Sequence, residues 1–326
     1  RQATAAANLN SKGNSLLTWE TTIKQNIAFD MGFFDNKLTA TIDVWKDTTK
    51  DLVSQDTQAI STTAIDAAAP YVNLGELENA GFDLSLNYSD VTSNGLQYSI
   101  SGNFTRAKNE ITSLISPFYT GGGSRVGPMT RTEVGQPISF FYGRKVLGIF
   151  QTQAEVAASA QPDAAPGRFI YDDLNNDGVI NDEDRQKIGD PHPDLIFGIN
   201  INLNYKNWDL SAFMNGTYGN DIFNFEALYY ESPYFFEGSR STAVLDSWRP
   251  DNTDAKLPAL SETIQNNEFT TANSHFVRDG SYLRLRTLQI GYTLPDSFAS
   301  KLGADSARVY YNGTNLFTIT DYDGYD

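Results

Sequence analysis

The feature that most constrains this chain is a period-2 alternation of apolar and polar residues that recurs along its whole length. Side chains of a β-strand point alternately to its two faces, so this alternation indicates strands with one apolar and one polar face. Seven segments show it cleanly and the last is less regular: 23–31, 38–44, 82–89, 96–105, 197–205, 208–214, 288–294 and 308–318. The sequence therefore predicts an all-β chain of about eight strands.

The connections between these strands alternate in length. The short ones are 32–37, 91–95, 206–207 and 295–306, and the long ones are 49–79, 107–194 and 218–275. Outer-membrane β-barrels have short turns on one side of the membrane and long loops on the other. Soluble β-sandwiches also alternate apolar and polar residues, but they seldom place every short turn at one end. The pattern favours a transmembrane antiparallel β-barrel with long extracellular loops and leaves a soluble β fold open.

Composition narrows the partners. With 24 Lys and Arg against 40 Asp and Glu, the net charge is −16, which argues against a nucleic-acid partner. The chain has no cysteine, so neither disulfides nor thiol chemistry are available. Aromatic residues near the expected strand ends would suit the girdle of a barrel at the membrane interface: Tyr88, Tyr98, Tyr205, Trp208 and Tyr292.

A calcium-type loop lies in the longest interval, within 166–190. It carries oxygen ligands at the spacing of an EF-hand loop, with Gly178 at the sharp turn. The candidate ligands are Asp173, Asn175, Asp177, the carbonyl of Val179, Asn181 and Asp184. No amphipathic helix precedes the loop, so a structural Ca²⁺ ion is expected rather than a calcium sensor. The alternative is an Asx-rich turn that binds no ion.

Catalysis has little support, and no enzyme activity is expected. The only histidines, His192 and His275, are distant in sequence and have no cysteine partner. Glu76 and Glu78 could form the carboxylate pair of a hydrolase, but such acidic pairs are more often solvated loop charges.

Two arginines conflict with a simple lipid-facing strand. In an unbroken strand, Arg284 and Arg286 share a face with Leu288. A charge is costly on the lipid face at the membrane centre. Either the strand extends beyond the membrane there, or a β-bulge shifts the register.

A series of segments points to a known family. Among them are Asn79-Ala80-Gly81-Phe82-Asp83 and Arg278-Asp279-Gly280-Ser281-Tyr282. In order and spacing, the series resembles the C-terminal half of SusC/RagA-type TonB-dependent outer-membrane transporters of Bacteroidetes. The segments that carry this resemblance are 17–22, 26–38, 73–83, 134–143, 148–150, 166–178, 276–286 and 291–295.

The resemblance implies a barrel of about 22 strands. Residues 1–326 would then supply about eight of them, with the signal peptide, plug and final strand outside this chain. It also implies import of oligosaccharides or peptides across the outer membrane of a Gram-negative bacterium. The expected partners are outer-membrane lipid, a SusD-like lipoprotein and, through the absent N-terminal part, the TonB complex.

Substrate or lid contacts are expected from aromatic residues in the long intervals. The candidates are Phe118, Tyr119, Phe223, Phe225, Tyr229, Tyr230, Tyr234, Phe235 and Phe236. Their rings suit sugars or peptide side chains, but they could equally pack against a lipoprotein lid. A rival function is a secreted or surface β protein, stapled by calcium, that binds carbohydrate. A second rival is a glycoside hydrolase.

Overall fold

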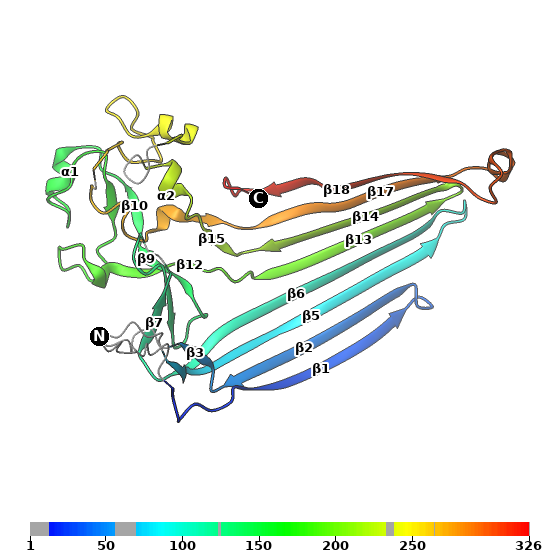
Figure 1. The fold of residues 1–326 in the computed structure, drawn as a ribbon, viewed down its shortest axis with the longest axis horizontal. Coiled ribbons are helices and arrows are strands. Elements are labelled where there is room, and N and C mark those ends of the chain that lie inside the picture. Colours follow the sequence, from blue (N-terminus) through cyan, green and yellow to red (C-terminus); the bar gives the residue numbers. More distant parts are fainter. Residues whose placement is uncertain (1–12, 56–69, 123–124, 233–237, 264, 326) are drawn as a thin grey trace, which may run out of the picture.

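The computed structural model describes residues 13–55, 70–122, 125–232, 238–263 and 265–325. Its main element is one antiparallel sheet (Figure 1). Each strand of this sheet lies beside the strand of the same sheet that follows it along the chain. The sheet order is β1 (Thr21–Phe33), β2 (Leu38–Lys50), β5 (Gly75–Val91), β6 (Gln97–Leu114), β13 (Leu195–Tyr205), β14 (Trp208–Tyr218), β17 (Tyr282–Thr293) and β18 (Arg308–Thr320). The predicted all-β fold with eight strands is confirmed. Within the described residues, β1 and β18 form the two edges of the sheet.

The register joins the apolar positions of all eight strands into one face. One row of directly opposed residues crosses the whole sheet: Phe29, Ile42, Leu84, Phe104, Phe197, Gly216, Leu283 and Ile319. Opposed residues of an antiparallel pair lie on the same face. Gly216 makes room for an aromatic neighbour in this row, because a Cβ there would lie 2.6 Å from the Phe197 ring. We call this side of the sheet the apolar face.

The adjacent row lies on the opposite side and is polar. It contains Asp30, Thr41, Ser85, Asn103, Gly198, Asn215, Arg284 and Thr318. We call this side the polar face. The alternation in the sequence therefore places apolar and polar residues on opposite faces of one sheet, which we call the wall. The pattern also fixes the register, because a shift of one residue would exchange the two faces of a strand.

A β-bulge resolves the conflict at Arg284 and Arg286. The registers of β17 with β14 and with β18 both shift at Arg286. Leu285 then lies opposite Met214 on the apolar face, and Arg284 lies opposite Asn215 on the polar face. The bulge alternative is therefore the one that this strand adopts.

The short turns gather at one end of the sheet and the long intervals at the other (Figure 1). Lys206 and Asn207 form the tightest turn, with Lys206 at a φ of 53°. The loosest turn contains α3 (Asp296–Ala299) and the 3₁₀ helix η4 (Ser300–Leu302). At the turn end of the apolar face, Tyr88 stacks against Tyr98 and Trp208 against Tyr292, with ring centroids 5.7 and 4.7 Å apart.

The long intervals form what we call the loop layer, made of the described residues of 51–74, 115–194 and 219–281. Its strands are β3 (Val53–Gln55), β4 (Tyr71–Asn73), β7 (Phe118–Gly121), β8 (Thr130–Glu133), β9 (Phe140–Arg144), β10 (Val146–Ile149), β11 (Phe169–Tyr171), β12 (Arg185–Gly189), β15 (Asp221–Phe223) and β16 (Val277–Asp279). Its helices are α1 (Gln153–Ala157), α2 (Ala227–Tyr230) and the 3₁₀ helices η1 (Asp182–Asp184), η2 (Thr242–Asp246) and η3 (Ser274–Phe276). Strands β12, β9, β8 and β7 form a second sheet in that order.

The principal cluster of fully buried apolar residues lies in the loop layer. Its members are Val126, Ala227, Leu228, Ala272 and Phe276. By contrast, the apolar face of the main sheet is uncovered: Ile27 is 66% exposed and Phe29 is 62% exposed. No helix in the described part of the chain is long and apolar enough to span a membrane.

Candidate functional site

The polar face of the wall is covered by hydrogen bonds between neighbouring strands. Thr41 Oγ1 donates to Asp30 at 2.6 Å, and Ser85 Oγ donates to the side-chain oxygen of Asn103 at 2.8 Å. Asp43 lies directly opposite Asp83, with its Oδ2 accepting a hydrogen bond from Asn26. Such a face suits contact with water and polar solutes, because buried polar groups need partners that an apolar medium cannot supply.

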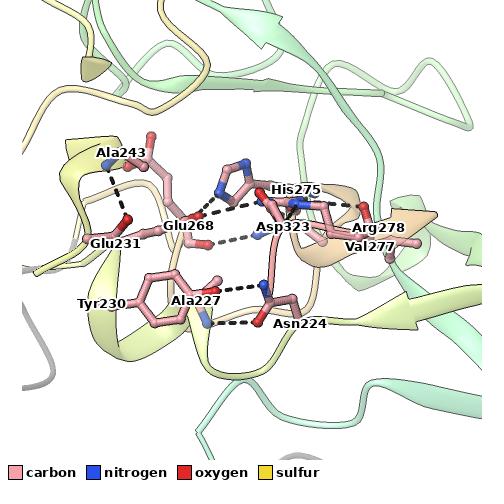
Figure 2. A network of polar contacts seen from close by, with 12 residues as sticks. Asn224, Ala227, Tyr230, Glu231, Ala243, Glu268, His275, Val277, Arg278 and Asp323 are labelled. Atoms are coloured by element: carbon pink, nitrogen blue, oxygen red, sulfur yellow. Dashed lines mark hydrogen bonds and ion pairs between the residues drawn. The ribbon is translucent and has the colours of Figure 1, made fainter. Parts of the chain in front are cut away.

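A polar network joins the loop layer to the segment that follows the last strand (Figure 2). His275 Nε2 lies 2.7 Å from Glu231 Oε2, and both side chains are nearly buried. Arg278 lies 3.6 Å from Glu231 and 3.5 Å from Asp323, and it donates to the carbonyl of His275. These residues come from the end of α2, from η3, from β16 and from the segment after β18. The network therefore joins the third long interval to the segment that follows the last strand.

A buried ion pair links two different long intervals. Arg168 Nη1 lies 3.0 Å from Glu268 Oε2, and the two side chains are 10% and 2% exposed. Glu268 Oε1 also accepts the N–H of Phe169 at 2.8 Å. Burial raises the pKa of Glu268 to about 7, although the guanidinium of Arg168 acts in the opposite direction.

Sequence reasoning missed this pair. The two residues are 100 positions apart, and each belongs to an interval without periodic signal. The two residues are recognised as partners because both charged side chains are buried together in the folded chain. The sequence pattern alone does not show this burial. His192 Nε2 lies 2.9 Å from the carbonyl oxygen of Ile138.

The predicted aromatic contacts separate into two groups. Phe118 and Tyr119 are consecutive residues of β7, so their side chains lie on opposite faces of that strand. Their register partners on β8 are Glu133 and Thr132. The guanidinium of Arg131 stacks over the Phe118 ring at 4.1 Å, whereas Tyr119 is buried. These two rings therefore do not form one contact surface.

The aromatic residues of the third interval pack within the loop layer. Phe223, Phe225, Tyr229 and Tyr230 lie against its buried cluster. The Phe223 ring centroid lies 5.8 Å from Phe141 and 5.7 Å from Phe276. Tyr234, Phe235 and Phe236 lie outside the described residues. A role for any of these rings in substrate or lid binding stays a prediction.

The calcium-type loop is closed by its own hydrogen bonds. The carboxylate of Asp173 accepts the N–H groups of Asp177 and Gly178 at 3.2 and 2.9 Å. Asp184 is fully buried and accepts the N–H groups of Leu174 and Asn181 at 3.0 and 2.7 Å. Across the described residues, no group of three or more His, Cys, Asp or Glu side chains is arranged to hold a metal ion. The calcium site, with Asn175 and Val179 among its predicted ligands, stays a prediction.

Calcium binding has a direct test. If the ion is structural, chelation with EGTA should speed amide hydrogen exchange over 173–184 without lowering the melting temperature of the wall, whose strands pair elsewhere. The Asp177→Ala variant, which lacks one charged ligand, should no longer respond to EGTA. Global unfolding on chelation, or no change of exchange in this loop, would contradict a structural calcium site.

Comparison with known proteins gives a consistent result. No protein-family model matches the chain. The TonB-dependent receptor P3 of Formosa agariphila is 33% identical in an alignment of 321 positions that covers 96% of this chain and 31% of that receptor. The TonB-dependent receptor SusC of Bacteroides thetaiotaomicron is 25% identical in an alignment of 318 positions that covers 96% of this chain and 30% of SusC.

A solved structure agrees in fold. The RagAB peptide transporter superimposes with a TM-score of 0.78 at 24% identity, over 97% of this chain and 33% of that one. The chain spans about a third of the length of the curated relatives it matches. The predicted resemblance to SusC/RagA-type TonB-dependent outer-membrane transporters is thereby confirmed along nearly the whole chain.

Proposed function

We propose that this chain forms part of the wall of a TonB-dependent importer in the outer membrane of a Gram-negative bacterium. The observation that carries the proposal is the uncovered apolar face, which runs across all eight strands and is backed by a polar face. In this arrangement the apolar face contacts lipid, the polar face lines a wet lumen, and the loop layer lies outside the cell. The two edge strands would pair with further strands to close a barrel of about 22 strands.

Import, rather than catalysis, is the activity we assign to the natural protein that carries this chain. Its relatives include proteins named SusC and TonB-dependent receptor, and one similar structure is titled a peptide transporter. We therefore propose oligosaccharides or peptides as substrates, a SusD-like lipoprotein over the loop layer and TonB as the source of energy. A structural Ca²⁺ ion in the 173–184 loop belongs to the same proposal.

The rival, a secreted carbohydrate-binding β protein, fits less well. A soluble protein rarely leaves a large contiguous apolar surface exposed. Val309 on β18 is 65% exposed and Val44 on β2 is 56% exposed, so the uncovered surface extends over nearly the full width of the sheet.

Fractionation and growth test the proposal together. The natural protein should stay with the outer-membrane fraction after a carbonate wash and should need detergent for release. A strain that lacks it should lose growth on one class of glycan or peptide, and a strain whose TonB-contacting segment is deleted should lose the same growth. Release in buffer alone, or growth that does not depend on TonB, would contradict the proposed function.

A further inference from the structure

The wall has a gap beside β6, between the main sheet and the loop layer. Strand β6 pairs with β13 only as far as Thr105, which lies opposite Ile196. Farther along β6, Ile111 exchanges backbone hydrogen bonds of 2.9 Å with Gly135 and Gln136. Within the described residues, no strand pairs with this edge of β6 over 106–110, and a cavity of about 630 Å³ opens there.

Cations occupy the side of this gap that continues the apolar face. The register places Arg106 opposite Phe82 and Lys108 opposite Ala80. Arg106 and Lys108 therefore lie on the same face of β6 as Phe104. Lys46 follows Val44 in the same way on β2. The apolar face thus ends in a band of charged residues, at the height where lipid headgroups would meet the wall.

Arg106 differs from the other cations of this band. Lys46 pairs with Glu78 at 2.7 Å, and Lys108 pairs with Glu110 at 2.5 Å. Lys187, on the far side of the cavity, pairs with Asp190 at 2.8 Å. Arg106 is exposed and forms no ion pair with any described residue.

Arg106 is the cation of the cavity lining that has no carboxylate partner among the described residues. The lining contains the cations Arg106, Lys108 and Lys187 and the carboxylates Asp190 and Asp194. Lys108 and Lys187 are each paired with a carboxylate, so Arg106 supplies the positive charge that can meet an anion here. Phe82 also lines the cavity, which connects it to the apolar face. An occupant that fits both properties carries an anionic group next to an apolar chain.

We propose that this cavity binds the phosphate-bearing headgroup of a membrane lipid, with Arg106 as its main contact. The planar guanidinium of Arg106 can donate two parallel hydrogen bonds to a phosphate. The acyl chains would lie along Phe82 and Phe104 on the apolar face. The inference rests on the proposed membrane location of the wall.

Native mass spectrometry of the natural protein tests this assignment. The protein is reconstituted in nanodiscs of phosphatidylcholine with a minor share of phosphatidylglycerol, and the lipids that it retains after detergent extraction are counted. We expect selective retention of phosphatidylglycerol, and a loss of about tenfold for Arg106→Gln, as for removal of a charge-assisted hydrogen bond. Lys301→Gln, which makes the same charge change at the turn end of the sheet, should retain phosphatidylglycerol like the unmodified protein.

Each other outcome has a definite meaning. Equal retention by the unmodified protein and Arg106→Gln, or equal retention of the two lipids, would overturn the site. Displacement of the lipid by millimolar inorganic phosphate would show a site for free phosphate and overturn the lipid assignment. A protein that fails to enter nanodiscs contradicts the proposed function, whereas one that enters without selective retention contradicts only this inference. Arg106→Lys, which keeps the charge, should give intermediate retention and separates misfolding from loss of contact.

Discussion

Replacing Arg168 with methionine should destabilise the loop layer by about 3–5 kcal/mol, because the change leaves the carboxylate of Glu268 buried without its partner. The Glu268 side chain is 2% exposed and Arg168 is its only ion-pair partner within the described residues. The loss should appear as faster amide hydrogen exchange over 168–171, where Phe169 donates to Glu268. Exchange in the central strands of the wall should stay unchanged.

The pH dependence of this loss gives a second check. Burial holds the pKa of Glu268 at about 7 even beside Arg168, and removal of the guanidinium raises it further. When the pH lies below the pKa of Glu268 in the variant, the side chain is neutral and its burial costs less free energy. The destabilisation caused by Arg168→Met should therefore be large at pH 9 and smaller at pH 6.

The control is an exposed ion pair. Lys24 and Asp47 lie 3.1 Å apart, with the lysine side chain 75% exposed. Lys24→Met should cost less than about 1 kcal/mol, since exposed pairs contribute little. If Arg168→Met and Lys24→Met have equal effects on the loop layer, the buried pair does not hold it together.

A lysine on the apolar face should be the most damaging change in the wall. Ile201 lies between Ile100 and Ala212 in the middle of the sheet, far from both ends of its strand. Ile201→Lys should destabilise the membrane-inserted protein by about 2–4 kcal/mol, the cost of a cation facing lipid near the bilayer midplane. Urea unfolding in phosphatidylcholine vesicles measures this loss.

The adjacent position supplies the matched control. Asn200 points to the polar face and lies between Ser101 and Phe213. Asn200→Lys introduces the same side chain at the same height but toward water, so it should cost less than about 1 kcal/mol. Equal costs at the two positions would contradict the assignment of faces.

Much of the wall could be predicted from the sequence because its two environments repeat with period 2. The apolar side chain of Phe197 and the polar side chain of Asn200 each indicate the face on which the residue lies. The eight expected strands are confirmed. The ends of the strands were harder to predict. Strand β6 continues to Leu114 and β5 begins at Gly75. These parts extend beyond the apolar face and have no alternation of apolar and polar residues, so the sequence gives no sign of them.

The loop layer could not be predicted in the same way. The interval 107–194 was expected to be a connection only, but it contains the four short strands of a second sheet. Strands of three to five residues, such as β8 and β9, are too short for a period to be recognised. The bulge at Arg286 was predictable only as one of two alternatives, because its register depends on the neighbouring strands.

Accessibility along β5 tests the central claim most directly. The chain has no cysteine, so a single cysteine with a spin label can be placed at each position from Phe82 to Asn87 once any cysteine elsewhere in the natural protein is replaced. In the natural protein in nanodiscs, oxygen, which concentrates in lipid, should relax labels at Phe82, Leu84 and Leu86. A water-soluble nickel chelate should instead relax labels at Asp83, Ser85 and Asn87. Equal nickel accessibility at all six positions would contradict a wall with one face in lipid and the other in water.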